Sequence, residues 1–362
     1  MILTKDTNPE RKINIPLFAI TAGFISVFCL MALIDVNALA AWVDRSFAWS
    51  VTYFGLYWQV LLLATFLISL GMACLPGARS VMGNIDKPEF SNFQWGSMIM
   101  CTLLAGGGVF WAAGEPMAHF LSVPPVFGDV EAGTGEATVY ALAQSYLHWG
   151  FLAWAILGSL TVIMLMYYHY EKGLPLAPRT LLYPIFKRRA IQGPIGTITD
   201  AVCIVAVVAG TVGPIGFLGL QVSYGLNTLF GIADNATTQT AVISVLTIVY
   251  VASAITGVTK GIQLLSRLNM ILAVCLLAFL MVTTSAMFVI SHFFEALGTH
   301  ITHFFQMALY RGDAGIFGKA GWLGWWTVFF WGWFIGYGPM MAIFIARISK
   351  GRSIRAIVIM LS

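Results

Sequence analysis

Charged side chains are scarce in this sequence. Only 9% of the 362 residues are Asp, Glu, Lys or Arg, whereas 59% are hydrophobic and the mean hydropathy is +0.85. A soluble domain carries about 25% charged residues, so this composition excludes a soluble globular protein. We therefore interpret the chain as an integral membrane protein.

Cysteines are few, and their spacing fits neither a disulfide framework nor a zinc site. All of them fall in or at the ends of apolar segments, where thiols act as small core residues: Cys29, Cys74, Cys101, Cys203 and Cys275. The sequence also lacks a nucleophile elbow, an HExxH helix and a phosphate-binding loop. We expect no enzymatic activity, no metal site and no cofactor.

Long apolar runs dominate the chain instead. A hydrocarbon core about 30 Å thick requires about 20 apolar residues in each spanning helix. Eight segments meet this length: 15–34, 51–75, 93–113, 141–168, 198–220, 240–258, 268–290 and 322–346. A ninth begins at Ile354. The first segment is too long for a signal peptide and lacks a small-residue cleavage site, so we expect it to be retained.

The basic residues indicate how the chain crosses the membrane, since short loops rich in Lys and Arg stay cytoplasmic. With a cytoplasmic N-terminus, all of the 19 Lys and Arg except Arg45, Arg311 and Lys319 lie on the inner side. The net charge of +4 is therefore a topology signal and gives no argument for nucleic acid binding. We expect a multi-pass protein of the cell inner membrane.

Three connecting segments are expected to lie at the membrane surface. The basic, proline-containing loop 172–194 is suited to anionic lipid headgroups. Segments 37–50 and 292–307 are too short to span and mix charge with aromatic residues, which favours interfacial helices. The second one carries His292, His300 and His303, which have no nearby cysteine and few carboxylates. We interpret them as solvent-exposed (wet) histidines at the membrane interface and not as a metal site.

Two of the apolar segments contain residues that weaken a helix. The third includes Ala105 followed by Gly106, Gly107 and Gly108, and the eighth reads "WGWFIGYGPMMAIF", with Gly336, Gly338 and Pro339. Glycine costs about 1 kcal/mol and proline about 3 kcal/mol inside a helix. Transporters built from inverted repeats place broken helices at corresponding positions, with substrate and ion at the break. These two segments are five apart, so we predict paired breaks that line a pathway; the alternative is close helix packing.

At these residues the sequence resembles the betaine/choline/carnitine transporter family. The similar motifs occur in order: "NIDKPEFSNFQW", "FWAAGEPMAHFLSVPP", "YLHWGFLAWAI", "KGIQLLSRLNM" and "FIARISKGRSIR". The resemblance implies an all-α, leucine-transporter-like bundle with two inverted repeats. We expect two leading helices in 1–90, the first five-helix repeat in 91–292, and an interfacial helix with an incomplete second repeat in 293–362.

The resemblance also implies a substrate site for trimethylammonium compounds, whose charge is attracted by aromatic faces. Trp149 and Trp154 match the two tryptophans of the fourth span, while Leu157 stands where members often have tyrosine. The expected site residues are Trp111, Trp149, Trp154, Trp333, Phe334, Tyr337 and Met341, with Ala105, Gly106, Gly107, Gly108, Gly336 and Gly338 at the helix breaks. Phe334 replaces a tryptophan, and Met341 resembles a methionine of sodium-independent carnitine antiporters. Glu115 is expected to be a structural element and not a proton carrier.

The resemblance leaves ion coupling and activity open. Sodium-coupled members use alternate glycines at the third-span break, and the altered pattern "AGGG" weakens the expectation of sodium coupling. Family members continue through four more spans, so we expect the 362-residue chain not to transport by itself. We therefore expect a secondary transporter of betaine, choline or carnitine type, with a homotrimer as the implied assembly. The alternative is a membrane protein that binds such compounds without transporting them.

Overall fold

The computed structural model describes residues 14–361 except 86, 104–108, 129, 258–260 and 313–320. Within these ranges every named secondary element is helical, and the only β contact is an isolated bridge between Val81 and Ser353. Seven helical stretches are long and apolar enough to cross a membrane: Ile15–Ile34, Val36–Cys74, Gly135–Glu171, Pro194–Phe230, Ala236–Thr256, Gln263–Thr283 and Gly321–Ile348. The prediction of an all-α membrane protein is confirmed.

The first two helices meet at a single residue. Helix α1 (Ile15–Ile34) has the predicted bounds, and Asp35 separates it from α2 (Val36–Cys74). The Asp35 carboxylate accepts hydrogen bonds from the backbone N–H groups of Asn37 (3.0 Å) and Ala38 (2.9 Å), which caps α2. The prediction of a separate interfacial helix at 37–50 was wrong, because no glycine or proline interrupts this segment before it joins the second span.

The third apolar segment includes residues of α3 (Asn92–Leu103) and of α4 (Val109–Leu121). The predicted break at Ala105, Gly106, Gly107 and Gly108 lies outside the described residues. A short 3-10 helix η1 (Pro76–Arg79) precedes α3, and another, η3 (Pro125–Phe127), follows α4. Pro116 is inside α4, which extends beyond the predicted end of the segment at residue 113.

The fourth span is the most irregular one. It consists of α5 (Gly135–Trp149), α6 (Phe151–Trp154), the π-helix η4 (Ala155–Ser159), α7 (Leu160–Met166) and the π-helix η5 (Tyr167–Glu171). Single π-helical turns within α-helices often occur at functional sites. The apolar run 141–168 predicted a single spanning helix here and gave no indication of these π-helical turns.

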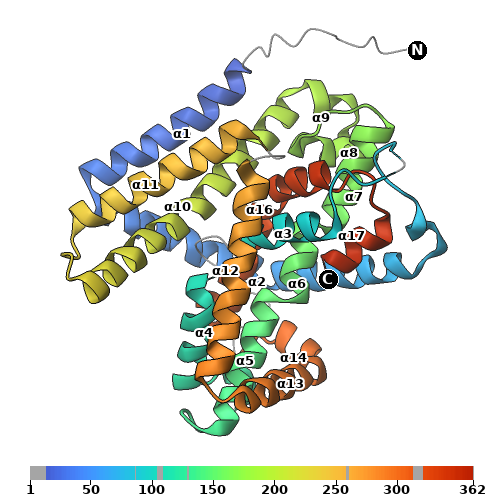
Figure 1. The fold of residues 1–362 in the computed structure, drawn as a ribbon. Helices are drawn as coiled ribbons and strands as arrows, with labels where there is room; N and C mark the ends of the chain where they lie inside the picture. The colour runs from blue at the N-terminus through green and yellow to red at the C-terminus, as the bar shows by residue number, and fades with distance from the viewer. Residues whose placement is uncertain are drawn as a thin grey trace.

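The basic loop after the fourth span folds into the 3-10 helix η6 (Pro178–Leu182) and the short helices α8 (Tyr183–Phe186) and α9 (Arg188–Gln192). Two long helices follow, α10 (Pro194–Phe230) and α11 (Ala236–Thr256). Figure 1 shows α1 and α11 lying along α10 on one side of the molecule. This layer packs against the rest of the bundle through contacts of α10 with α16, η6 and α9 and of α1 with α2.

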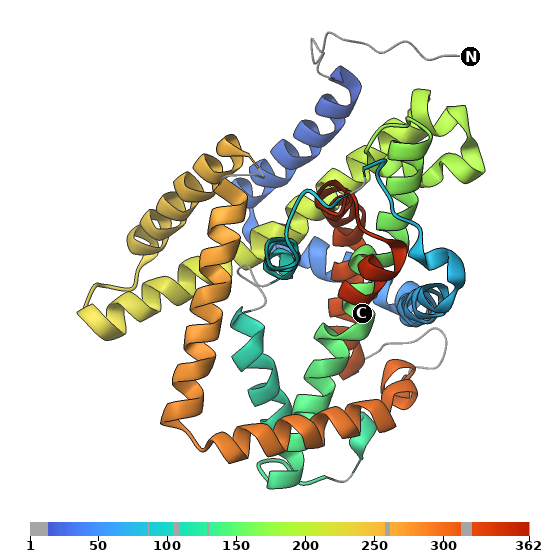
Figure 2. The same cartoon turned by 45° about the vertical axis from the view of Figure 1, so that its right-hand side comes forward.

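The seventh apolar segment ends earlier than expected. Helix α12 covers Gln263–Thr283, and α13 begins at Ala286, where the Ser285 hydroxyl caps the backbone N–H of Phe288 at 3.3 Å. The predicted single span 268–290 was therefore wrong, because Thr283, Thr284 and Ser285 end one helix and start another. Figure 2 shows α13 (Ala286–Thr302) running crosswise to α12, and the short α14 (Phe304–Ala308) follows it.

The eighth span is not broken at its glycines and proline. Helix α15 (Gly321–Trp325) leads into α16 (Thr327–Ile348), which is continuous through Gly336, Gly338 and Pro339. A Cβ atom at Gly338 would lie 3.1 Å from the Ile156 carbonyl oxygen of η4, and one at Gly336 would lie 3.7 Å from the Cβ of Ala206. The predicted helix break at Gly336 and Gly338 was wrong: here glycine allows close helix packing.

The buried core lies between α2, the fourth span, α14 and α16. Its largest fully buried side chains on α16 are Phe330, Trp331 and Phe334. A second apolar cluster joins α3 and α7 to the end of α16 and to α17 (Ile354–Met360). Helix α16 therefore holds the two clusters together and positions the aromatic residues of the fourth span.

Candidate substrate-binding site

The fourth span breaks at Gly150, between two of the predicted site tryptophans. Its backbone dihedrals are φ −92° and ψ −136°, and its N–H still donates to the Tyr146 carbonyl at 2.8 Å. A Cβ atom at this position would lie only 2.4 Å from the Tyr146 oxygen. Only glycine fits this close approach, which ends α5 at Trp149 and starts α6 at Phe151.

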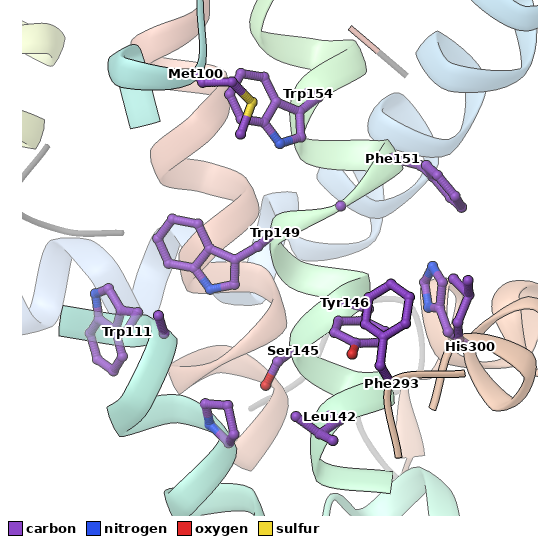
Figure 3. A pocket seen from close by; sticks show the side chains of 14 residues that line it. Met100, Trp111, Leu142, Ser145, Tyr146, Trp149, Phe151, Trp154, Phe293 and His300 are labelled. Atoms are coloured by element: carbon purple, nitrogen blue, oxygen red, sulfur yellow. The ribbon is translucent and has the colours of Figure 1, made fainter. Parts of the chain in front are cut away.

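A cavity of about 470 Å³ opens beside this break. Small-molecule sites typically measure about 300–1,000 Å³. The cavity is lined by Met100, Trp111, Ala112, Pro116, Leu142, Ser145, Tyr146, Trp149, Gly150, Phe151, Trp154, Phe293, Leu297 and His300. Figure 3 shows Trp111 and Trp149 on one flank of the fourth span and His300 on the other. The walls come from α3, α4, the fourth span and α13.

Three of the predicted site residues line this cavity, namely Trp111, Trp149 and Trp154. The other four do not belong to its described lining: Trp333, Phe334, Tyr337 and Met341. All four belong to or pack against the apolar core that also contacts Trp149. Two of them, Trp333 and Phe334, contact the Trp149 ring directly. The Trp149 ring centroid lies 6.0 Å from that of Trp333 and 5.5 Å from that of Phe334, both in edge-to-face contact.

Two aromatic residues of α16 also bond to α10. The Trp333 indole N–H donates to the Gly210 carbonyl at 3.1 Å, and the Tyr337 hydroxyl lies 3.4 Å from the Thr211 hydroxyl oxygen. Trp333 thus contacts α10 through its N–H group and Trp149 through its ring. The polar groups of these two rings are occupied within the helix bundle.

Trp149 is fixed by a carboxylate on α4. Its indole N–H donates to Oε2 of Glu115 at 2.6 Å, and Oε1 of Glu115 lies 2.5 Å from Nδ1 of His148. The Glu115 side chain is fully buried. One carboxylate therefore sets the orientation of two consecutive residues at the end of α5, in agreement with the structural role expected for Glu115.

The contacts of Glu115 continue to α16. Nε2 of His148 lies 2.8 Å from the Thr327 hydroxyl oxygen and 2.9 Å from the amide nitrogen of Gln144. Each ring nitrogen of His148 thus has a partner, with Nδ1–H donating to the carboxylate and Nε2 accepting. This chain of hydrogen bonds connects α4, α5 and the start of α16.

His119 approaches the same carboxylate, with Nε2 3.3 Å from Oε1 of Glu115. Glu115, His119 and His148 are the residue types that zinc prefers, and their ligand atoms lie within 4.8 Å of one another. However, the carboxylate and the His148 imidazole already bind each other and their neighbours. We therefore interpret Glu115 and His148 as part of a structural hydrogen-bond network, with the His119 ring packed beside it against Trp326.

The α13 side of the cavity was not predicted from the sequence. Phe293 and His300 come from α13, and Tyr146 and Phe151 flank them from the fourth span. The His300 ring centroid lies 6.4 Å from that of Tyr146 and 5.7 Å from that of Phe151. His300 is buried in this aromatic wall, so the interpretation of this histidine as wet and interfacial was wrong. The residues next to His300 in the sequence do not indicate that it is buried, because its burial depends on how α13 crosses the bundle.

The close approach at Gly150 leads to a first prediction. In Gly150→Ala, the new methyl group would clash with the Tyr146 carbonyl and force α5 and α6 apart. We expect the thermal unfolding midpoint in detergent to fall and ligand binding to weaken, with a free-energy cost of about 1–3 kcal/mol. Gly225→Ala in α10 is the matched control, because no atom lies within 4 Å of its added Cβ. Equal behaviour of the two variants would contradict this explanation of the break.

Comparison with known proteins places the chain in a family of transporters. Residues 16–362 match the family model described as betaine/carnitine/choline family transporter. The chain is 54% identical over 347 residues to glycine betaine transporter 2 of Vibrio parahaemolyticus serotype O3:K6, covering 96% of this chain and 63% of that protein.

Two further relatives extend the comparison. The chain is 32% identical to the high-affinity choline transport protein of Escherichia coli K12, covering 97% of this chain and 51% of that protein. It is also 32% identical to the glycine betaine transporter OpuD of Bacillus subtilis 168, covering 94% of this chain and 65% of that protein. The chain thus spans between half and two thirds of the length of these relatives.

Proposed function

Because the chain belongs to the betaine/carnitine/choline transporter family, we propose that it forms the substrate site of a secondary transporter for small quaternary ammonium osmolytes. The observation that carries this proposal is the position of Trp149 and Trp154 on either side of the helix break, where both line one cavity. Tryptophan provides the strongest aromatic face for a cation. The relatives compared above include betaine and choline transporters, which supports the same substrate class.

The chemistry of the cavity suits a cation without N–H groups. Its described lining contains no Asp or Glu, and six of its fourteen lining residues are Phe, Trp or Tyr. A trimethylammonium group cannot donate N–H hydrogen bonds, so it gains from ring faces and loses little in the absence of carboxylates. The hydrogen bond from the Trp149 N–H to Glu115 also makes that indole more electron-rich, which strengthens its attraction for a cation.

Membrane orientation and assembly form part of this proposal. The distribution of Lys and Arg supports a cytoplasmic N-terminus in the inner membrane. Family resemblance supports a homotrimer. Labelling of single-cysteine variants from each side of intact cells tests the orientation, and mass measurement of the detergent-solubilised chain tests the trimer.

Measurements of ligand binding and of uptake on the same vesicles test the proposed function. The purified chain is reconstituted in liposomes with radiolabelled betaine, choline and carnitine, with and without a sodium gradient and with internal substrate for exchange. Saturable uptake of one compound supports secondary transport and shows which gradient drives it. Saturable binding without uptake supports the second candidate, a binding protein that does not transport. Absence of both binding and uptake contradicts both candidates.

A further inference from the structure

His300 is a buried polar residue that the aromatic site does not yet explain. Its side chain is 2% exposed, it lines the cavity, and neither ring nitrogen has a hydrogen-bond partner among the described residues. Leaving a buried polar group unpaired costs about 1–3 kcal/mol. Such a group facing a cavity is therefore suited to a ligand that supplies the missing partner.

The surroundings of His300 are aromatic. Its ring makes edge or tilted contacts with Tyr146, Phe151 and Phe304, and the Phe304 centroid lies 5.5 Å away. Burial in this apolar wall lowers the pKa of His300 to about 4. The imidazole is therefore neutral at pH 7, with one nitrogen that donates a hydrogen bond and one that accepts.

We propose that His300 donates a hydrogen bond to the carboxylate of the bound osmolyte, so that the site favours zwitterionic onium carboxylates over onium ions without a carboxylate. This inference rests on the proposed function, because the onium end of the ligand is placed against Trp149 and Trp154. Trp149, Gly150 and His300 line the same cavity, and Figure 3 shows Trp149 and His300 on opposite flanks of the fourth span. A ligand that contacts both would therefore lie across the break at Gly150.

Two other polar side chains of the cavity are already hydrogen-bonded within the protein. The Ser145 hydroxyl already donates to the Ala141 carbonyl at 2.9 Å. The Trp149 indole N–H already donates to Oε2 of Glu115 at 2.6 Å. His300 is a side-chain donor of the cavity lining that has no partner within the described protein, and a hydrogen bond to a charged acceptor is stronger than one between neutral groups.

Selectivity between two ligands provides the test. Dissociation constants for glycine betaine and tetramethylammonium are measured by calorimetry on the chain in lipid nanodiscs, for the unaltered protein, His300→Phe and His300→Gln. In His300→Phe we expect betaine binding to weaken about tenfold to a hundredfold, the range for a hydrogen bond to a charged group, with tetramethylammonium binding unchanged. His300→Gln retains an N–H donor and should preserve most of the preference for betaine.

His303→Phe is the matched control. His303 lies on the next turn, its Nδ1 is 3.1 Å from the Thr299 carbonyl oxygen, and it is not part of the described cavity lining. This variant should bind both ligands as the unaltered protein does. An unchanged ratio of the two dissociation constants in His300→Phe would overturn the role of His300 while leaving the proposed function intact. Failure of the unaltered chain to bind either ligand would overturn both.

If His300→Phe does not fold, a measurement on the unaltered chain still tests the proposed hydrogen bond. The six histidines are labelled with ¹⁵N, and their spectrum is recorded in nanodiscs with each ligand. Betaine should shift one imidazole resonance, and this shift should be absent with tetramethylammonium. Identical spectra with the two ligands would contradict the hydrogen bond.

Discussion

Trp149→Ala is expected to weaken binding of glycine betaine or choline about thirtyfold or more. A desolvated tryptophan face contributes about 2 kcal/mol to cation binding, and 1.4 kcal/mol corresponds to a factor of ten. The substitution also removes the edge-to-face contacts of this ring with Phe330, Trp333 and Phe334. Calorimetry with the reconstituted chain provides the measurement.

Two further variants make this result specific. Trp149→Phe keeps an aromatic face but loses the N–H that bonds to Glu115, so its affinity should be intermediate. Trp49→Ala removes an exposed tryptophan of α2 that does not line the cavity, and it should bind as the unaltered chain does. Equal affinities in Trp149→Ala and Trp49→Ala would show that the cation does not contact Trp149.

Glu115→Ala is expected to destabilise the protein strongly and to impair binding as well. It leaves the Trp149 N–H and the His148 Nδ1–H without acceptors in a fully buried site. Each unpaired buried donor costs about 1–3 kcal/mol, and Trp149 loses the bond that sets its orientation. We expect a lower thermal unfolding midpoint and an altered tryptophan emission spectrum.

Glu115→Gln separates the contribution of Glu115 to stability from the contribution of its negative charge to cation binding. The amide has nearly the same shape and keeps one acceptor oxygen, so most of the stability should return while binding of the cation remains weaker. Thr327→Val removes the hydroxyl at the far end of the same network and should have a smaller effect, about 1 kcal/mol. If Glu115→Ala unfolds at the same temperature as the unaltered chain, the network does not stabilise the site.

The sequence predicted the helices well wherever composition alone determines them. The bounds of α1 are those of its apolar run, and the positions of Trp149 and Trp154 on one span follow from their motif. The prediction failed where local signals compete with packing. Three glycines and a proline suggested a broken eighth span, yet α16 remains helical because Gly338 allows close packing against η4.

The break that the structure does contain is marked by a single glycine. Gly150 carries no more local signal than the glycines of α10, and its role becomes visible only through the position of the Tyr146 carbonyl. The same is true of His300, whose burial depends on the way α13 crosses the fourth span. Contacts between segments far apart in sequence, such as Glu115 with His148, also have no periodicity that a single sequence could reveal.

The most direct test of the cation site compares glycine betaine with 3,3-dimethylbutanoate, in which a carbon atom replaces the quaternary nitrogen. The two ligands have nearly the same shape and share the carboxylate, so they differ mainly in the positive charge that the indole faces attract. Calorimetry on the reconstituted chain should show saturable binding of glycine betaine and binding of the carbon analogue that is about thirtyfold weaker or absent. Equal affinity for the two ligands would contradict recognition of the cation by Trp149 and Trp154.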